Sequence, residues 1–189
     1  SGRHFKARCM KLIILDRDGV INHDSPDYIK HPDEWIALPG SLQAIARLHQ
    51  AGYTIAVASN QSGLARGLFD ITTLTAIHQK LRKELGQLAG AIDAFFVCPH
   101  GPDEHCICRK PLPGLFEDIA KRYDTELTGV PAIGDSLRDL QASAAVGCTP
   151  WLVQTGNGPK TLKQGKLPEG TRHASDLAHA VDQILTQAA

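Results

Sequence analysis

Two aspartates at the end of a short apolar run are the first residues whose type and spacing suggest chemistry. Asp16 and Asp18 follow the apolar run at 11–15, one residue apart, and Gly19 comes next. An apolar run this short and β-branched is typical of a buried strand. Two carboxylates this close repel each other unless a cation or a proton relieves the repulsion. The pattern therefore predicts a metal site, a nucleophile, or both.

Three more polar clusters follow apolar runs in the same way. The residues that follow the runs at 54–58, 94–97 and 131–133 include Ser59, Asn60, Gln61 and Ser62, then Arg109 and Lys110, then Asp135, Ser136 and Asp139. Any one cluster is also consistent with an ordinary turn, because Asp, Asn, Ser and Gly favour turns. The carboxyl ends of parallel strands, however, meet at one edge of a sheet, where ligands bind. We therefore expect the four clusters to form one site.

The elements that must position these clusters alternate between strands and helices. Strands are expected at 11–15, 54–58, 94–97, 131–133 and 151–153. Apolar residues three and four apart predict helices around 42–48, 74–85, 115–123, 137–144 and 175–186. This alternation predicts an α/β fold, a three-layer doubly wound parallel sheet with helices on both faces. Residues 156–170 are rich in Gly, Lys and Pro and are expected to form a surface loop.

Composition limits the class of protein. The chain has 189 residues, 42% of them hydrophobic, which fits one domain with a core. Lys plus Arg and Asp plus Glu each total 20, and this balance argues against a nucleic-acid binder. No run is apolar enough to span a membrane and none resembles a signal peptide, so we expect a cytoplasmic monomer. Because Met10 is the only methionine, residues 1–9 are expected to be a leader left from expression, and 10–189 a single domain.

A second cluster combines cysteines and histidines. Cys98, Cys106 and Cys108 lie within eleven residues of one another, with His100 and His105 between them. In a cytoplasmic protein such crowding indicates a metal rather than disulfides, although free thiols in a loop are the alternative. Three thiolates and one imidazole match a closed Zn²⁺ site, whose role is structural rather than catalytic. Either histidine has a spacing that suits the fourth ligand.

The carboxylate clusters fit phosphoryl transfer. A phosphomonoester dianion repels an anionic nucleophile, and Mg²⁺ bound to carboxylates such as Asp16 and Asp135 would relieve that repulsion. A carboxylate beside the metal can attack phosphorus and form an aspartyl-phosphate, while a second carboxylate moves the proton. Lys110 and the Ser59 hydroxyl can hold the equatorial phosphate oxygens.

The four motifs resemble those of the haloacid dehalogenase superfamily of phosphatases. They read D-x-D-G at 16–19, Ser-Asn at 59–60, Lys before Pro at 110–111, and G-D-x-x-x-D at 134–139, in the order found in that family. The resemblance implies a Rossmann-like sheet of the haloacid dehalogenase type. No insertion in this chain is long enough for a large cap domain.

The resemblance also implies a role for each motif residue. Asp16 would be the nucleophile, and Asp18 the general acid and base. Ser59 and Lys110 would bind the transferring phosphate. The Mg²⁺ ligands would be Asp16, the backbone carbonyl of Asp18, and Asp135. Asp139 would bind the metal through a water molecule or support the direct ligands from behind.

The cysteine-rich loop resembles one branch of the superfamily. In that branch C-P-H precedes C-x-C-R-K-P, which favours His100 over His105 as the ligand and defines a zinc loop at 98–108. The branch includes heptose bisphosphate phosphatases and histidinol-phosphate phosphatases. Residues 60–67 resemble the N-Q-S-G-x-A-R-G of the heptose enzymes, whereas the histidinol enzymes resemble N-Q-D-G there. The resemblance thus implies a sugar bisphosphate substrate, on the route to activated heptose and lipopolysaccharide, with histidinol phosphate as the alternative.

The phosphate that is not cleaved needs partners of its own. Arg66 and Arg109 are expected to bind it, although either is also consistent with a solvated surface charge. The insertion at 22–33 is expected to close over the site, or to be an ordinary surface loop. The other expected substrate contacts are Asp24, Ser25, Asp27, Asn60, Gln61, Ser62 and Ser136. Some relatives carry Lys at the position of Ser136.

A function of a different class is a non-catalytic phosphorylation receiver or a zinc-stabilised binding module. Receivers also gather aspartates and a lysine on a parallel sheet. They do not need Asp18 as an acid, or a zinc loop beside Lys110, and a phosphate-release assay distinguishes the two classes.

Overall fold

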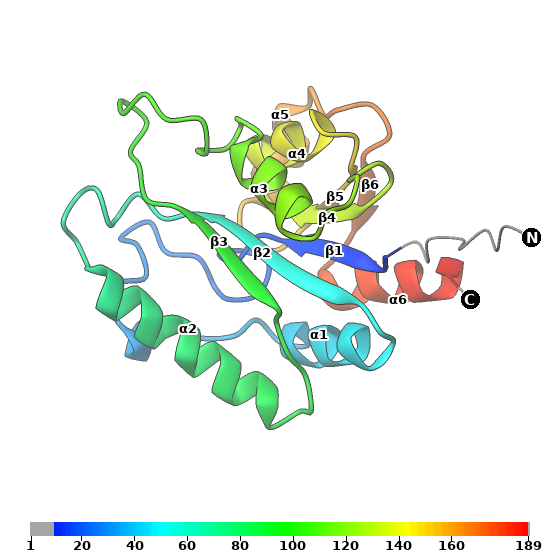
Figure 1. Ribbon diagram of the computed structural model, residues 1–189, viewed down its shortest axis with the longest axis horizontal. Coiled ribbons are helices and arrows are strands. Elements are labelled where there is room, and N and C mark those ends of the chain that lie inside the picture. Colours follow the sequence, from blue (N-terminus) through cyan, green and yellow to red (C-terminus); the bar gives the residue numbers. More distant parts are fainter. Residues whose placement is uncertain (1–9, 189) are drawn as a thin grey trace, which may run out of the picture.

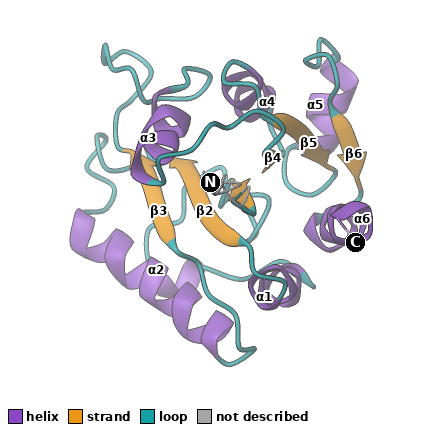
Figure 2. Cartoon of the chain, turned by 45° about the vertical axis from the view of Figure 1, so that its right-hand side comes forward, coloured by secondary structure: helices purple, strands orange, loops and turns teal. Residues whose placement is uncertain are grey.

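The computed structural model describes residues 10–188, which form a six-stranded sheet with helices on both faces (Figures 1 and 2). The strands are β1 (Leu12–Leu15), β2 (Thr54–Asn60), β3 (Ala94–Cys98), β4 (Pro131–Gly134), β5 (Thr149–Val153) and β6 (Arg172–Ala174). Every neighbouring pair is parallel, in the order β3-β2-β1-β4-β5-β6. The predicted fold class is confirmed. The expectation for residues 1–9 lies outside the described residues.

The helices differ from the prediction mainly near the C-terminus. They are α1 (Ser41–Gln50), α2 (Ile71–Gly86), α3 (Gly114–Arg122), α4 (Leu137–Ala144), α5 (Gly158–Gln164) and α6 (Leu177–Ala188), with a short 3₁₀ helix, η1 (Pro32–Glu34). The prediction of a surface loop at 156–170 was wrong, because α5 lies inside it. Tertiary contact stabilises α5, whose buried Thr161 donates a hydrogen bond to Asp135 O at 2.7 Å. Strand β6 was not predicted either, because three residues are too few to show a period.

Both faces of the sheet are covered, which explains why β1 is apolar throughout. Ile13 and Leu15 pack in the cluster that includes α1, α2 and α6, whereas Leu12 and Ile14 pack in the cluster that includes α3 and α4. Figure 2 shows the two helical layers. Among residues 10–188, no helix combines the length and the apolar character that crossing a membrane requires.

Two long connections extend the carboxyl edge of the sheet. One, at 16–40, joins β1 to α1, and the other, at 99–113, joins β3 to α3. The first connection is fixed by the buried Trp35 and by Lys80 of α2, whose Nζ donates hydrogen bonds to Pro32 O at 2.9 Å and to Trp35 O at 2.7 Å. Polar residues on this connection therefore have a defined position relative to the sheet.

Candidate active site

A cavity of about 230 Å³ opens at the carboxyl edge of the sheet and gathers most of the predicted site residues. The predicted residues that line it are Asp16, Asp18, Asp24, Ser25, Asn60, Gln61, Ser62, Arg66, Arg109, Lys110, Asp135 and Asp139. They come from the ends of β1, β2 and β4, from the connections that follow β1, β2 and β3, and from the first turn of α4. The four clusters therefore converge, as the rule for parallel sheets requires.

Lys110 lies buried among acceptors at this cavity. Its Nζ donates hydrogen bonds to Asp16 Oδ1 at 3.1 Å, to Asp139 Oδ1 at 2.8 Å and to Ala58 O at 2.7 Å. Burial disfavours the charge, but Asp139 and Asp16 outweigh it and hold the pKa of Lys110 above its ordinary value. The Asn60 side chain fixes the backbone of Lys110, since its Oδ1 accepts from Lys110 N and its Nδ2 donates to Lys110 O.

Three carboxylates crowd around this lysine. Oxygens of Asp16, Asp135 and Asp139 lie within 4.8 Å of one another. Burial, and then the charge of Asp139, raises the pKa of Asp16 to about 7 and that of Asp135 to about 9. At Asp139 burial would raise the pKa, but the charge and the hydrogen bond of Lys110 have the larger effect, so the pKa of Asp139 is lowered. One lysine cannot neutralise three carboxylates, and these are the oxygen ligands that Mg²⁺ prefers. The donor set fits a divalent cation.

Asp135 is held by backbone groups that only glycine allows to approach. Its Oδ2 accepts a hydrogen bond from Asn157 N at 2.8 Å. A Cβ on Gly19 or on Gly156 would collide with the same Oδ2, and both glycines have positive φ. The G of the D-x-D-G motif therefore brings the β1 loop against the β4 carboxylate.

Asp18 lies in a different environment from the other carboxylates. Its Oδ1 accepts hydrogen bonds from Arg17 Nε at 3.0 Å, Arg17 Nη2 at 2.9 Å and Asn22 Nδ2 at 3.0 Å. Its Oδ2 accepts one, from Gln61 Nε2 at 3.0 Å. Burial alone would raise the pKa of Asp18, but Arg17 and these donors lower it. Because Oδ1 already has three donors, Oδ2 is the oxygen that can exchange a proton.

Three of the residues predicted for catalysis or substrate binding do not line the cavity. Ser59 is buried behind it, and its Oγ accepts a hydrogen bond from Gln61 Nε2 at 2.9 Å. Ser136 precedes α4, where its backbone N donates to Asp139 Oδ2 at 3.1 Å. Asp27 is exposed, and its backbone N donates to Ser25 Oγ at 3.1 Å. Direct substrate contact by these three residues stays a prediction.

Four lining residues were not predicted: Tyr28, Ile29, Arg138 and Asn157. For two of them, Arg138 and Asn157, the sequence did contain an indication that they belong to the site. Arg138 lies inside the G-D-x-x-x-D motif, and Asn157 follows β5, whose carboxyl end reaches the same edge as the other strands. Tyr28 and Ile29 lie on the connection after β1, which is irregular, so no periodicity in the sequence indicates which of its side chains face the cavity. The Arg66 guanidinium lies over the Tyr28 ring, 5.7 Å from its centroid.

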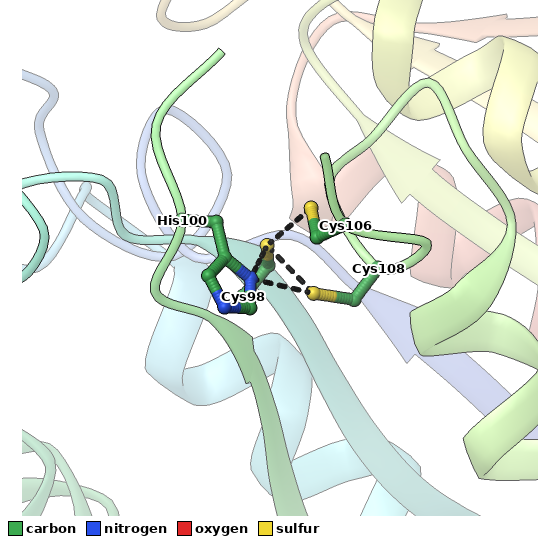
Figure 3. Close-up of side chains that lie close together, drawn as sticks. All are labelled: Cys98, His100, Cys106 and Cys108. Atoms are coloured by element: carbon green, nitrogen blue, oxygen red, sulfur yellow. Dashed lines mark hydrogen bonds between the residues drawn. The ribbon is translucent and has the colours of Figure 1, made fainter. Parts of the chain in front are cut away.

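The cysteine-rich loop forms a compact cluster of four potential ligands (Figure 3). Cys98 ends β3, and the loop returns Cys106 and Cys108 to it, so that all four donor atoms lie within 4.8 Å. Cys98 Sγ lies 3.8 Å from Cys106 Sγ, and His100 Nδ1 lies 3.3 Å from Cys108 Sγ and 3.6 Å from Cys98 Sγ. These three separations are comparable to those between ligands about 2.0–2.3 Å from a tetrahedral metal, whereas Cys98 Sγ and Cys108 Sγ lie closer together, at 2.8 Å. The cluster could hold a metal, and it contains His100 rather than His105.

Comparison with known proteins identifies the family. Residues 27–147 match the hydrolase family described as haloacid dehalogenase-like hydrolase. The chain is 68% identical to the D-glycero-β-D-manno-heptose-1,7-bisphosphate 7-phosphatase of Bordetella bronchiseptica, over 95% of this chain and 100% of that protein. It is 53% identical to the protein of the same name from Pseudomonas aeruginosa, over 92% of this chain and 97% of that one.

A solved structure agrees with these sequence matches. The crystal structure of D,D-heptose 1,7-bisphosphate phosphatase from B. bronchiseptica, complexed with magnesium and phosphate, resembles this chain with a TM-score of 0.93. The two chains are 68% identical, and the match covers 94% of this chain and 99% of that one. The haloacid dehalogenase resemblance is confirmed, and the chain belongs to the haloacid dehalogenase-like hydrolases.

Proposed function

We propose that this chain is a Mg²⁺-dependent phosphatase that removes the 7-phosphate of D-glycero-β-D-manno-heptose 1,7-bisphosphate, in the synthesis of activated heptose for lipopolysaccharide. The observation that carries the proposal is the convergence of Asp16, Asp135 and Lys110 in one cavity of a chain 68% identical to a phosphatase named for that reaction. Both relatives are named for the β-anomer, which supports that anomer here. Membership of a hydrolase family favours catalysis over a receiver or binding module.

In the proposed reaction, Asp16 attacks phosphorus in line with the departing sugar oxygen. The P–O bond to the sugar breaks as the bond to Asp16 forms, and the protonated form of Asp18, which the negative charge of the bound phosphate favours, donates a proton to the leaving oxygen. Asp18 then takes a proton from the water that attacks the aspartyl-phosphate, which releases phosphate and restores Asp16. Lys110 keeps Asp16 in position and balances negative charge at the phosphate.

Mg²⁺ would be held by Asp16, Asp135 and the backbone carbonyl of Asp18, with Asp139 in support. When bound, it supplies positive charge that lowers the repulsion between Asp16 and a phosphate dianion. Ser59 is proposed to bind the same phosphate. Its Oγ accepts from Gln61, and its own hydrogen has only a 3.5 Å contact with Asn60 O, so that hydrogen is available to a ligand.

The rest of the cavity suits a polar sugar with a second phosphate. Arg66 and Arg109 are proposed to bind the phosphate that is not cleaved, and both line the cavity. Arg109 Nη1 donates a hydrogen bond to His100 O at 3.2 Å, so the cysteine-rich loop helps to orient the Arg109 guanidinium. The remaining proposed substrate contacts are Asp24, Ser25, Asp27, Asn60, Gln61, Ser62 and Ser136.

A substrate comparison tests the function. We expect kcat/KM for the β-anomer of heptose 1,7-bisphosphate to exceed that for histidinol phosphate and for the α-anomer by about tenfold or more, because either alternative leaves unpaired some of the polar groups placed for the β-anomer. Phosphate release and the position of the remaining phosphate are measured. A preference for histidinol phosphate, or loss of the 1-phosphate, would overturn the proposal.

We propose that Cys98, His100, Cys106 and Cys108 hold one structural Zn²⁺. Cys106→Ser is then expected to lose the metal and to lower Tm, with a smaller change in kcat of the folded protein, because the metal stabilises the loop and does not touch substrate. Zinc content and thermal unfolding are measured, and Cys148→Ser, outside the cluster, is expected to retain zinc. Full activity and an unchanged Tm in zinc-free protein would contradict this role.

We further propose that residues 10–189 act as a single domain and as a monomer in the cytoplasm. The described cysteines are free, as expected in a reducing compartment. Light scattering of the purified protein gives its oligomeric state.

A further inference from the structure

Arg17, the residue between the two catalytic-motif aspartates, is a buried cation with a particular set of partners. Its side chain has 0% relative exposure, so water does not reach the guanidinium. Two of its nitrogens, Nε and Nη2, donate to Asp18 Oδ1. Its Nη1 lies 3.1 Å from Nε2 of His78, which belongs to α2 and is 61 residues away in the chain. His78 thus offers the acceptor that Nη1 needs.

His78 is itself held in place. It lies on the buried face of α2 and stacks on Phe95 of β3, with ring centroids 4.0 Å apart and planes 10° apart. Burial, and then the neighbouring Arg17 charge, lowers the pKa of His78 to about 3, so the ring is neutral. A neutral ring can accept at Nε2, which places its hydrogen on Nδ1. The stack therefore presents a lone pair to Arg17 from a fixed direction.

From this geometry we propose that His78 is a positioning residue for proton transfer: it orients the Arg17 guanidinium, which fixes Asp18 with Oδ2 available to the substrate. The inference rests on the proposed function, in which Asp18 donates the proton. Arg17 directs a fork of two donors, Nε and Nη2, at the single oxygen Oδ1, and these charge-assisted hydrogen bonds fix where Oδ1 lies and leave Oδ2 outside the Arg17 contact. Without the acceptor on His78, Arg17 has an unpaired buried donor, and the fork is free to shift to satisfy it.

The leaving group distinguishes positioning from a merely structural role. A sugar alkoxide needs a proton as it departs, whereas p-nitrophenolate leaves well without one. Because kcat/KM reports the first phosphoryl transfer, a misplaced Asp18 should lower it for heptose 1,7-bisphosphate and spare p-nitrophenyl phosphate. A general acid contributes about 10²–10⁴-fold, so partial misplacement should cost the sugar substrate about 10–100-fold and the aryl substrate less than about threefold.

Two substitutions at His78 form a matched pair. His78→Phe keeps an aromatic ring to stack on Phe95 but removes the acceptor, and it should show the selective loss. His78→Gln restores an acceptor near the Nε2 position and should recover most of the sugar activity. Arg17→Lys, which keeps the charge but not the fork, should show the same selectivity as His78→Phe and serves if that variant folds poorly. Tm is measured for each variant.

The outcomes separate this inference from the function beneath it. Equal losses on both substrates, or no loss on either, in folded His78→Phe and Arg17→Lys would overturn the positioning role. Asp18→Asn is assayed in parallel. If Asp18→Asn shows the selective loss and the His78 and Arg17 variants do not, only the inference fails. If Asp18→Asn spares the sugar substrate, the acid role of Asp18 and the inference fail together.

Discussion

Asp16→Asn is expected to lower kcat by about 10⁴-fold or more while the protein remains folded. Asparagine has nearly the same shape as aspartate but is too weak a nucleophile to attack phosphorus. Its Oδ1 can still accept the hydrogen bond from Lys110, which also keeps its bond to Asp139. Removal of one charge from a cluster of three carboxylates does not add repulsion. Steady-state phosphate release gives the activity, and thermal unfolding reports the fold.

Asp118→Asn is the matched control for this change. It replaces a carboxylate by an amide on α3, at an exposed residue that does not line the cavity and has no proposed role. We expect its kcat to remain within about threefold of the unaltered chain, because surface substitutions rarely disturb a distant site. Substantial residual turnover by purified Asp16→Asn would contradict the assignment of the nucleophile.

Lys110→Met is expected to lower the free energy of unfolding by about 3–5 kcal/mol in buffer without added Mg²⁺, the cost that follows when one partner of a buried ion pair is removed. Methionine fills the space of the lysine stem but leaves the buried carboxylates of Asp16 and Asp139 without their shared cation. Catalysis should suffer as well, by about 10²-fold or more in kcat, because a preorganised positive charge at the phosphate is lost.

Urea unfolding of Lys110→Met, with Lys121→Met as control, measures this effect. Lys121 is exposed on α3, and its replacement should change the free energy of unfolding by about 0.5 kcal/mol or less. Added Mg²⁺ should restore part of the stability of Lys110→Met, because a cation bound by the carboxylates offsets their repulsion. If Lys110→Met were as stable as Lys121→Met, Lys110 would not be the cation that compensates this cluster.

The sequence was sufficient to predict residues whose position follows from a general rule. Asp16, Asp18 and Asp135 follow buried strands, and parallel strands place their carboxyl ends together, so convergence could be inferred without coordinates. The same rule applies to Asn157 after β5. The segment that follows is rich in Gly and contains Pro, so it was expected to be a loop and α5 was not predicted. That helix depends on tertiary contacts such as Thr161 with Asp135 O, which no local pattern reveals.

Other features depend on contacts that are distant in the sequence. The spacing of His78 among the apolar residues of α2 indicates only that it belongs to the buried face of that helix. Its contact with Arg17, 61 residues away in the chain, leaves no pattern in the local sequence. Spacing alone left His100 and His105 equivalent, and the folded loop places only His100 with the cysteines. Charge pattern likewise could not show that Lys110 is fully engaged by three acceptors.

Trapping the covalent intermediate is the most direct test of the proposed reaction. The enzyme with Mg²⁺ is mixed with heptose 1,7-bisphosphate and quenched in acid within one turnover, and its peptides are examined by mass spectrometry. The proposed reaction predicts that the peptide containing residues 12–19 gains the mass of one phosphoryl group at Asp16, and that Asp16→Asn gains none. Turnover with no phosphorylated peptide at any quench time, or a phosphoryl group on another residue, would contradict it.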